Sequence, residues 1–112
     1  MKKYEFTGET KTLSNGIILH RIKALVKIEF DAVTINFGDL GGWIEKEENL
    51  SQDGNAWVYD DAQVYGNARV YDNAQVYGNA WVYDNALVCD DARVFGNALV
   101  FGNARVCGNA RV

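Results

Sequence analysis

The stretch Gly54-Asn55-Ala56-Trp57-Val58-Tyr59 is the first copy of a six-residue unit that repeats without interruption to Val112. In every copy the third residue is Ala and the fifth is Val. The first two positions hold only Gly, Asp or Asn, and the sixth is Tyr, Phe or Cys. Such a strict short period indicates a solenoid, in which each unit packs on its neighbours.

Side-chain parity distinguishes the two folds that a short strand and a two-residue turn could build. In an antiparallel meander, Val58 would lie opposite Gln63, and every face would mix apolar with polar side chains. In a coil that winds one way, all Ala and Val positions point inward and the fourth and sixth positions point outward. Because Ala and Val never vary, the sequence predicts the one-way coil. Gly, Asp and Asn suit its corners, since they tolerate left-handed backbone angles, and stacked Asn residues can form amide ladders.

The run Val58-Tyr59-Asp60-Asp61-Ala62-Gln63 and its successors resemble the hexapeptide repeat of left-handed parallel β-helix proteins. That resemblance implies a triangular solenoid with roughly 18 residues per coil, so that residues 54–107 form about three coils. An aromatic residue after Val, together with residues 39–44 and 49–51, is more similar to a group of bacterial and phage proteins with Gly-Asn-Ala-x-Val-Tyr repeats. The expected fold class is therefore all-β, a left-handed parallel β-helix with an N-terminal β-hairpin and strand cap.

The N-terminal residues have a strand-like pattern. Ser14-Asn15-Gly16 lies between two alternating apolar runs, which predicts a β-hairpin. Further along, the even-numbered residues from Ile18 to Phe30 are mostly apolar, which places them on a buried face. A third short strand is expected at residues 33–37, after a turn at Asp31.

The residues between the hairpin and the repeats are expected to close the first coil. Gly38-Asp39-Leu40-Gly41-Gly42 breaks the strand pattern. Leu50 and Ile44 lie six and twelve residues before Ala56, which predicts two degenerate units with their larger side chains at the inward Ala position. The domain division is residues 1–50 as an N-terminal cap with the degenerate repeats, and residues 51–112 as the hexapeptide solenoid. A bare solenoid end would expose its core and strand edges, which the cap covers.

Composition and charge exclude several functional classes. Residues 1–50 carry seven basic and eight acidic groups, and residues 51–112 carry four Arg and seven Asp, so a basic nucleic-acid footprint is absent. The N-terminus has no apolar run of the kind found in signal peptides or membrane spans, and we expect a cytoplasmic protein with no membrane contact. The sequence predicts no cofactor and no metal site. Cys89 and Cys107 are expected to be stacked, reduced thiols, since parallel side-chain directions suit a disulfide poorly.

Folding the repeats at the implied coil length places aromatic residues in two outward ladders, Tyr59-Tyr77-Phe95 and Tyr65-Tyr83-Phe101. These ladders stabilise the sheets, form an interface, or do both. The candidate partner or oligomer surface consists of Trp57, Tyr59, Tyr65, Tyr77, Trp81, Tyr83, Phe95, Leu99 and Phe101. Trp57, Trp81, Leu87 and Leu99 favour an interface, because sheet stability does not require large apolar side chains at the outward fourth position.

Two further sets of residues are candidate sites. The acidic corners are Asp60, Asp61, Asp72, Asp84, Asp90 and Asp91, which could imitate nucleic-acid phosphates. The open end is Arg111 and Val112, where an uncapped last coil could pair with another copy. His20, the only histidine, lies on the apolar parity and is interpreted as a structural residue rather than a catalytic base.

Three functions remain open. The favoured one is a non-enzymatic binding scaffold with a protein partner and a tendency to form homo-oligomers, either a dimer through the C-terminal coil or a trimer. The resemblance to phage proteins implies an inhibitor that docks on a host protein of anti-defence type. The alternatives are a self-assembling structural element and a hexapeptide-type acyltransferase, although acyltransferases of this fold use a histidine on the solenoid, where this chain has none.

Overall fold

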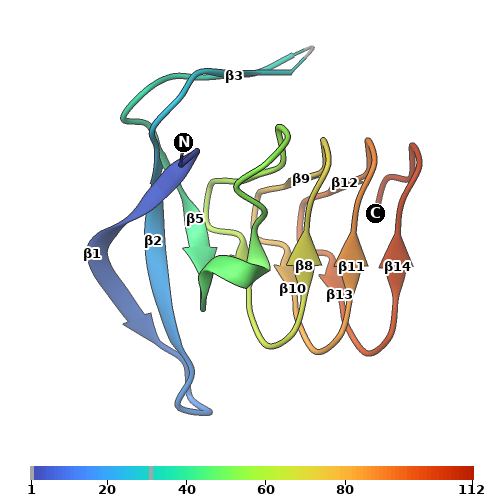
Figure 1. Cartoon of the computed structure of the whole chain (residues 1–112). Helices are drawn as coiled ribbons and strands as arrows, with labels where there is room; N and C mark the ends of the chain where they lie inside the picture. The colour runs from blue at the N-terminus through green and yellow to red at the C-terminus, as the bar shows by residue number, and fades with distance from the viewer. Residues whose placement is uncertain (1, 31) are drawn as a thin grey trace.

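The computed structural model describes residues 2–30 and 32–112, and it shows a stack of short parallel strands that is closed at one end by an antiparallel sheet (Figure 1). The N-terminal elements are β1 (Tyr4–Thr12), β2 (Ile18–Ala24), β3 (Ile28–Glu29), β4 (Thr34–Ile35), β5 (Leu40–Ile44) and the 3-10 turn η1 (Glu47–Asn49). The repeats supply β6 (Trp57–Val58), β7 (Gln63–Val64), β8 (Arg69–Val70), β9 (Gln75–Val76), β10 (Trp81–Val82), β11 (Leu87–Val88), β12 (Arg93–Val94), β13 (Leu99–Val100) and β14 (Arg105–Val106).

The repeats form a one-way coil, as the invariant Ala and Val predict. Every pairing between repeat strands is parallel, and each residue pairs with the one 18 positions later, such as Trp57 with Gln75. Three sheets result. The six-stranded sheet has the order β1-β2-β5-β7-β10-β13, the Arg69 sheet is β14-β11-β8, and the Trp57 sheet is β12-β9-β6. The chain is therefore a parallel β-solenoid, and its left-handed winding stays a prediction.

The hexapeptide repeats contribute only Ala and Val side chains to the core inside the coils. The inward Val residues from Val58 to Val94 are all 0% exposed, and the Ala residues from Ala56 to Ala92 are at most 1% exposed. Such a narrow core buries little apolar area per residue, so continuous backbone ladders carry much of the stability. Successive coils are joined by bonds such as Trp57 N to the Ala74 carbonyl, at 3.0 Å. Amide ladders at the corners also form, for example Asn67 to Asn85 at 3.2 Å.

The predicted hairpin is present in the cap. β1 pairs antiparallel with β2 across the turn at Asn15 and Gly16, and β4 lies within the expected third strand and pairs with β3. The predicted turn at Asp31 lies outside the described residues. The parity prediction is right at Ile22, Ala24 and Ile28, which are buried, but wrong at Ile18, which is 49% exposed.

Near the turn that joins β1 and β2, the odd-numbered face of β2 is buried instead of the even-numbered face. Leu19 is 0% exposed and packs with Trp43 and Tyr65 in a second, smaller apolar cluster. The sheet of β1, β2 and β5 is therefore apolar on both faces, which a single alternation along β2 could not reveal.

The expected break at residues 38–42 is wrong from Leu40 onward, because β5 begins there and joins the cap to the solenoid. β5 pairs antiparallel with β2 on one side and parallel with β7 on the other. Both Gly41 and Gly42 are needed for this close approach. A Cβ atom on Gly41 would lie 2.6 Å from Ile22 Cγ1, and one on Gly42 would lie 2.7 Å from the Ala62 carbonyl oxygen. The glycines thus permit the strand contact instead of breaking it.

The predicted alignment of the two degenerate units with the hexapeptide, which placed Ile44 and Leu50 at Ala positions, is also wrong. Ile44 pairs with Val64 and Leu50 bridges to Val70, so both occupy Val positions of a first coil that is 20 residues long. Both side chains are 0% exposed, as expected for inward residues. β5 lies between the cap strand β2 and the repeat strand β7. This face of the solenoid therefore has four parallel strands, β5, β7, β10 and β13, instead of three.

Candidate functional site

The two predicted aromatic ladders are present on the outward faces. In the first, ring centroids are 4.8 Å apart between Tyr59 and Tyr77 and 5.4 Å apart between Tyr77 and Phe95. In the second, Tyr65, Tyr83 and Phe101 stack with centroids 5.2 and 5.5 Å apart. All four ring pairs are within 12° of parallel. The ladders therefore act as cross-strand stacks that stabilise each coil against the next.

Two members of the predicted partner surface are covered by the cap. Trp57 is 0% exposed and meets the Tyr4 ring edge to face, with centroids 6.2 Å apart. Tyr65 is 9% exposed and packs beside Leu19 and Trp43. Outward direction from the solenoid does not mean contact with water here, because β1 and β2 fold against the first coils. Trp57 and Tyr65 are thus removed from any partner surface.

The later coils do expose apolar side chains on the six-stranded sheet. Trp81 pairs with Leu99 in adjacent strands, and the two are 40% and 52% exposed. Phe101, at the top of the second ladder, is 52% exposed. We call these three residues the Trp81 patch. A shallow groove beside it is lined by Lys11, Asp61, Gln63, Asn79, Trp81, Asn97 and Leu99. Of the other surface candidates, Phe95 is 37% exposed, while Tyr59, Tyr77 and Tyr83 are half-buried within their ladders.

Four of the acidic corners have a structural role. Asp60, Asp72, Asp84 and Asp90 have φ angles between 55° and 60°, in the left-handed region. Each carboxylate accepts a hydrogen bond from the backbone N–H of the residue 18 positions later, at 3.0 to 3.2 Å. Asp91 accepts from the Asn73 amide at 3.3 Å. These carboxylates join successive coils, which leaves less of their hydrogen-bonding capacity for a partner.

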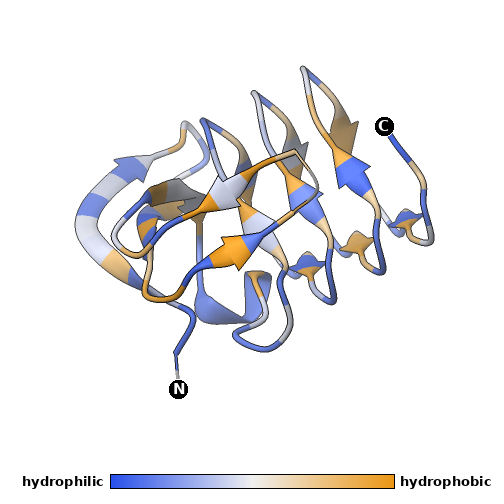
Figure 2. Cartoon of the chain, turned by 90° about the horizontal axis from the view of Figure 1, so that it is seen from above, coloured by the Kyte–Doolittle hydropathy of each residue, from blue (hydrophilic) through white to orange (hydrophobic). Residues whose placement is uncertain are grey.

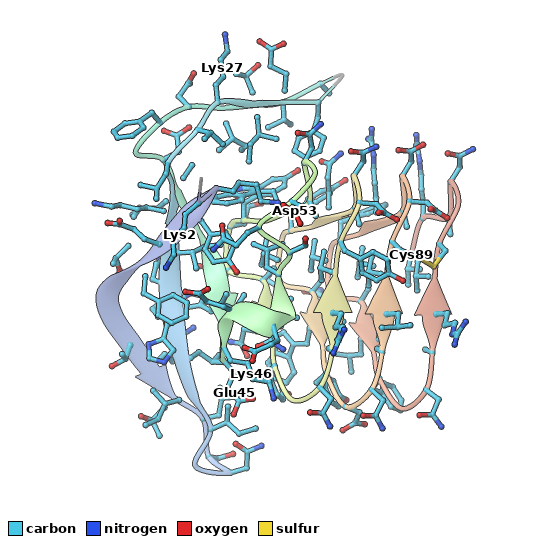
Figure 3. All side chains as sticks on the ribbon, viewed as in Figure 1. Lys2, Lys27, Glu45, Lys46, Asp53 and Cys89 are labelled. Atoms are coloured by element: carbon cyan, nitrogen blue, oxygen red, sulfur yellow. A yellow bond between two sulfur atoms is a disulfide. The ribbon has the colours of Figure 1, made fainter. Side chains whose placement is uncertain are left out.

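The expectation of reduced thiols is wrong, because Cys89 and Cys107 form a disulfide (Figure 3). The Cα atoms of adjacent stacked coils are 4.7 Å apart here, which falls within the range that a disulfide spans. Close strand spacing outweighs the parallel side-chain directions on which the sequence prediction relied. Asp90 lies near both sulfur atoms, but bonded sulfurs do not supply the thiolates that a metal site would need.

Buried polar groups fasten β1 to the first coil. Lys3 is 3% exposed, and its Nζ donates to the Ala56 carbonyl at 2.6 Å. Burial lowers the pKa of Lys3 to about 8, and the nearby Asp53 carboxylate opposes that shift. The Tyr4 hydroxyl donates to the carbonyls of Glu47 and Leu50, and burial raises its pKa above the usual value. Lys3 and Tyr4 thus provide hydrogen-bond donors for backbone carbonyl groups at the end of the solenoid that the cap covers. The sequence predictions did not include these contacts.

His20 belongs to the cap and stacks on Phe6, with ring centroids 4.5 Å apart and planes 6° from parallel. None of the four grooves that we describe on this surface is lined by His20. One groove on the Arg69 sheet lies between η1 and β8 and is lined by residues such as Glu48, Arg69 and Tyr71. Another groove lies on the Trp57 sheet. A small fourth one lies near Lys46 and Asn67.

The open end of the solenoid consists of edge strands. β13 and β14 each have one neighbour among the described strands, while β12 is extended by the bridge from Arg93 to Arg111. Ala104 and Ala110 are exposed, whereas the Ala residues of earlier coils are buried, and Val112 is 46% exposed. Val112 N donates to the Arg93 carbonyl at 2.9 Å, so the last residues continue the ladder of the Trp57 sheet.

The parallel register, the invariant core and the corner chemistry together define a repeat β-solenoid protein. A family model described as "YdcK Beta solenoid repeat" matches residues 62–78, 74–90 and 92–107. The chain is also 34% identical over 67 residues to a protein of Escherichia coli (strain K12) named "Uncharacterized acetyltransferase YdcK". That match covers 54% of this chain and 19% of the relative, so the chain spans a small part of the relative's length.

Across residues 2–30 and 32–112, we find no helix that is both long and apolar enough to cross a bilayer.

Proposed function

We propose that the chain is a protein-binding β-solenoid scaffold, and that the Trp81 patch is the surface by which it docks on a second copy of itself. The observation that carries this proposal is the exposure of Trp81, Leu99 and Phe101, three large apolar side chains that lie together on one sheet. Contiguous apolar surface of this kind on a folded protein marks interaction sites, and Trp and other aromatic residues are favoured anchors.

The patch is already ordered before binding. Its strands are held by parallel ladders, and Phe101 is fixed by stacking on Tyr83, with centroids 5.5 Å apart. Since little side-chain or backbone freedom remains to be lost, more of the gain from apolar burial is kept as binding free energy. A rigid flat face of this type suits a scaffold better than a reaction site, which needs convergent groups in a concavity.

Charge at the edge of the patch favours a second copy as the occupant. The groove beside Trp81 and Leu99 is bordered by one basic residue, Lys11, and one acidic residue, Asp61. A twofold interface brings the same patch of both subunits together, so it must be self-complementary. An apolar centre with one positive and one negative neighbour meets that condition, because Lys11 of each copy can face Asp61 of the other.

The oligomeric state in solution tests this proposal. Size-exclusion chromatography with light scattering should give a dimer at micromolar concentration, and Leu99→Glu should give a monomer. Leu87→Glu is the matched control, since Leu87 occupies the same repeat position on the Arg69 sheet and should leave the dimer intact. Asp61→Lys should weaken the dimer, and adding Lys11→Glu should restore it.

Three results would overturn docking through the patch. They are a monomer for the unmodified chain at several hundred micromolar, an assembly that Leu99→Glu leaves unchanged, and an equal effect of Leu87→Glu. An assembly that survives Leu99→Glu would instead favour pairing through the open end at Arg111 and Val112, as a dimer through the C-terminal coil or as a trimer. Docking on a host protein, as an inhibitor of anti-defence type, would use the same patch with a different partner.

The name of the matched relative favours a second candidate function, acetyl transfer. For this chain the test is direct binding of acetyl-coenzyme A measured by isothermal titration calorimetry. Saturable binding followed by acetyl transfer to an amine would support the enzyme, and heats equal to dilution would exclude it for this chain. The scaffold remains the better supported candidate, because the Trp81 patch is exposed for binding, whereas His20 lines none of the four described grooves.

A further inference from the structure

A polar groove runs along the Trp57 sheet, on a different face from the Trp81 patch. Its volume is about 420 Å³, and it is lined by Glu29, Phe30, Asn55, Asn73, Gln75, Asp91, Arg93, Asn109 and Arg111. The β3 and β4 hairpin overhangs this side of the coils, and Figure 2 shows it from above, crossing in front of them. The repeats supply the floor of this groove, and the cap supplies the segment that overhangs it. The groove therefore forms only where the two parts of the chain pack together.

The floor of the groove is a column of outward side chains at one repeat position. Gln75 pairs with Arg93, and Arg93 bridges directly to Arg111 in the next coil. Two arginines on directly paired residues of adjacent strands lie about 5 Å apart at their backbones, and like charges so placed repel each other. Arrangements of this kind are favourable when an anion lies between the two guanidinium groups.

Neither arginine forms an ion pair with a described residue. Within residues 2–30 and 32–112, the ion pairs are Lys2 with Glu47, Lys23 with Glu5, and Lys27 with Glu29, and none includes an arginine. The two carboxylates that line the groove have other partners. Glu29 pairs with Lys27 at 3.1 Å, and Asp91 accepts from the Asn73 amide at 3.3 Å.

A buried amide adds a further donor. Gln75 is 5% exposed, and its Oε1 accepts a hydrogen bond from the Tyr59 hydroxyl at 3.1 Å. With the oxygen occupied, the amide of Gln75 presents its N–H groups as donors, and we find no acceptor for them among the described residues. The Gln75 amide therefore adds N–H donors to the two guanidinium groups on the floor, and such donors are what an oxyanion requires.

We infer that this groove binds a small oxyanion, a phosphate or carboxylate group of a ligand, between Arg93 and Arg111 with Gln75 as an additional donor. Guanidinium groups bind both kinds of oxyanion through paired N–H bonds. The overhanging Phe30 partly shields the site from water, which strengthens the interaction. This site is independent of the scaffold function proposed above, since it lies on another sheet.

The probes are inorganic phosphate and succinate, each titrated at constant ionic strength with chloride as the reference anion. Nitrogen-15 NMR of the arginine Nε–Hε groups should show saturable shifts for Arg93 and Arg111. Saturation by phosphate alone identifies a phosphate site, and saturation by succinate alone identifies a carboxylate site. Shifts that are linear with concentration, or that are equal for chloride, would show that the groove holds no specific oxyanion.

Matched variants separate this site from general charge. Arg93→Gln with Arg111→Gln should reduce affinity at least tenfold. Arg69→Gln with Arg105→Gln should change it less than twofold, because those residues share the repeat position but have Leu87 between them. Arg93→Lys with Arg111→Lys keeps the charge and should bind more weakly than the unmodified chain. Equal losses in the first two double variants, with circular dichroism unchanged, would overturn the inference.

Discussion

At the scale of single residues, the first corner position of each repeat is the most constrained outward site. It is Gly or Asp in every unit, and at Asp60, Asp72, Asp84 and Asp90 the backbone has a positive φ angle that most residues avoid. An aspartate compensates for this strain by binding the next coil, as Asp84 does through the Gly102 N–H at 3.1 Å. Gly solves the same problem by having no Cβ atom.

Two substitutions at Asp84 should therefore destabilise the protein by different amounts. Asp84→Ala keeps the left-handed strain and loses the hydrogen bond, so it should lower the free energy of unfolding by about 2 kcal/mol. Asp84→Gly also loses the bond but relieves the strain, and its cost should be about 1 kcal/mol or less. Urea unfolding followed by circular dichroism measures both. Equal costs for Ala and Gly would show that backbone strain has no part in the choice of residue.

At the scale of elements, the last two levels of the Arg69 sheet are joined covalently. β11 and β14 pair in parallel, and the Cys89–Cys107 disulfide lies directly after both strands. β14 is an edge strand with one neighbour among the described strands, so it would otherwise be held by few contacts. The disulfide closes a loop of 18 residues and thus restrains the part of the solenoid that is most prone to fray.

Removing this cross-link should therefore destabilise the end of the solenoid. For a loop of this length the loss is about 3 kcal/mol in the chain-entropy description, and Cys89→Ser with Cys107→Ser should lose that much. Hydrogen exchange should accelerate most at residues 105–107 and least in β7. Dithiothreitol should reproduce the effect in the unmodified chain and do nothing to the double variant. Identical melting curves with and without reductant would contradict the cross-link.

At the scale of the whole molecule, cap and solenoid are one packed unit. Trp57 lies at their junction, is 0% exposed, and belongs to the same apolar core as Tyr4, Ile22 and Val58. Its indole Nε1 has no hydrogen-bond partner among the described residues, so the ring contributes through packing. Trp81 occupies the same position of the hexapeptide four units later, on the six-stranded sheet, and is 40% exposed.

These two tryptophans should respond differently to truncation. Trp57→Ala should cost about 3 to 5 kcal/mol, as for other fully buried aromatic residues, whereas Trp81→Ala should cost about 1 kcal/mol or less. Trp57→Phe is the control that keeps an aromatic ring and removes the unpaired donor, and it should retain most of the stability. Urea unfolding at a concentration where each variant is monomeric gives the comparison. Similar costs at Trp57 and Trp81 would mean that the cap does not share the core.

The sequence predicted most of the contacts that recur at the 18-residue offset, although it missed the disulfide between Cys89 and Cys107. The aromatic ladders, the Asn ladder and the buried Ala and Val each follow from one unit stacked on the next, so a single parity argument applied to all of them. The candidate surface was less predictable. Trp81, Leu99 and Phe101 are exposed as expected, but Trp57 and Tyr65 are covered, because the exposure of an outward residue depends on what folds over it.

The hexapeptide pattern by itself determined the one-way coil, its inward and outward positions and its corner chemistry, because these depend on interactions between neighbouring units. Only the tertiary structure decided the rest. The cap reaches the solenoid through contacts such as Lys3 to Ala56, which are 53 residues apart and leave no periodic signal. The same holds for the Gly41 and Gly42 junction and for the groove beneath β3 and β4, where a non-repeating segment meets the repeats. Long-range packing of a unique segment therefore determines which outward residues of the solenoid remain available for function.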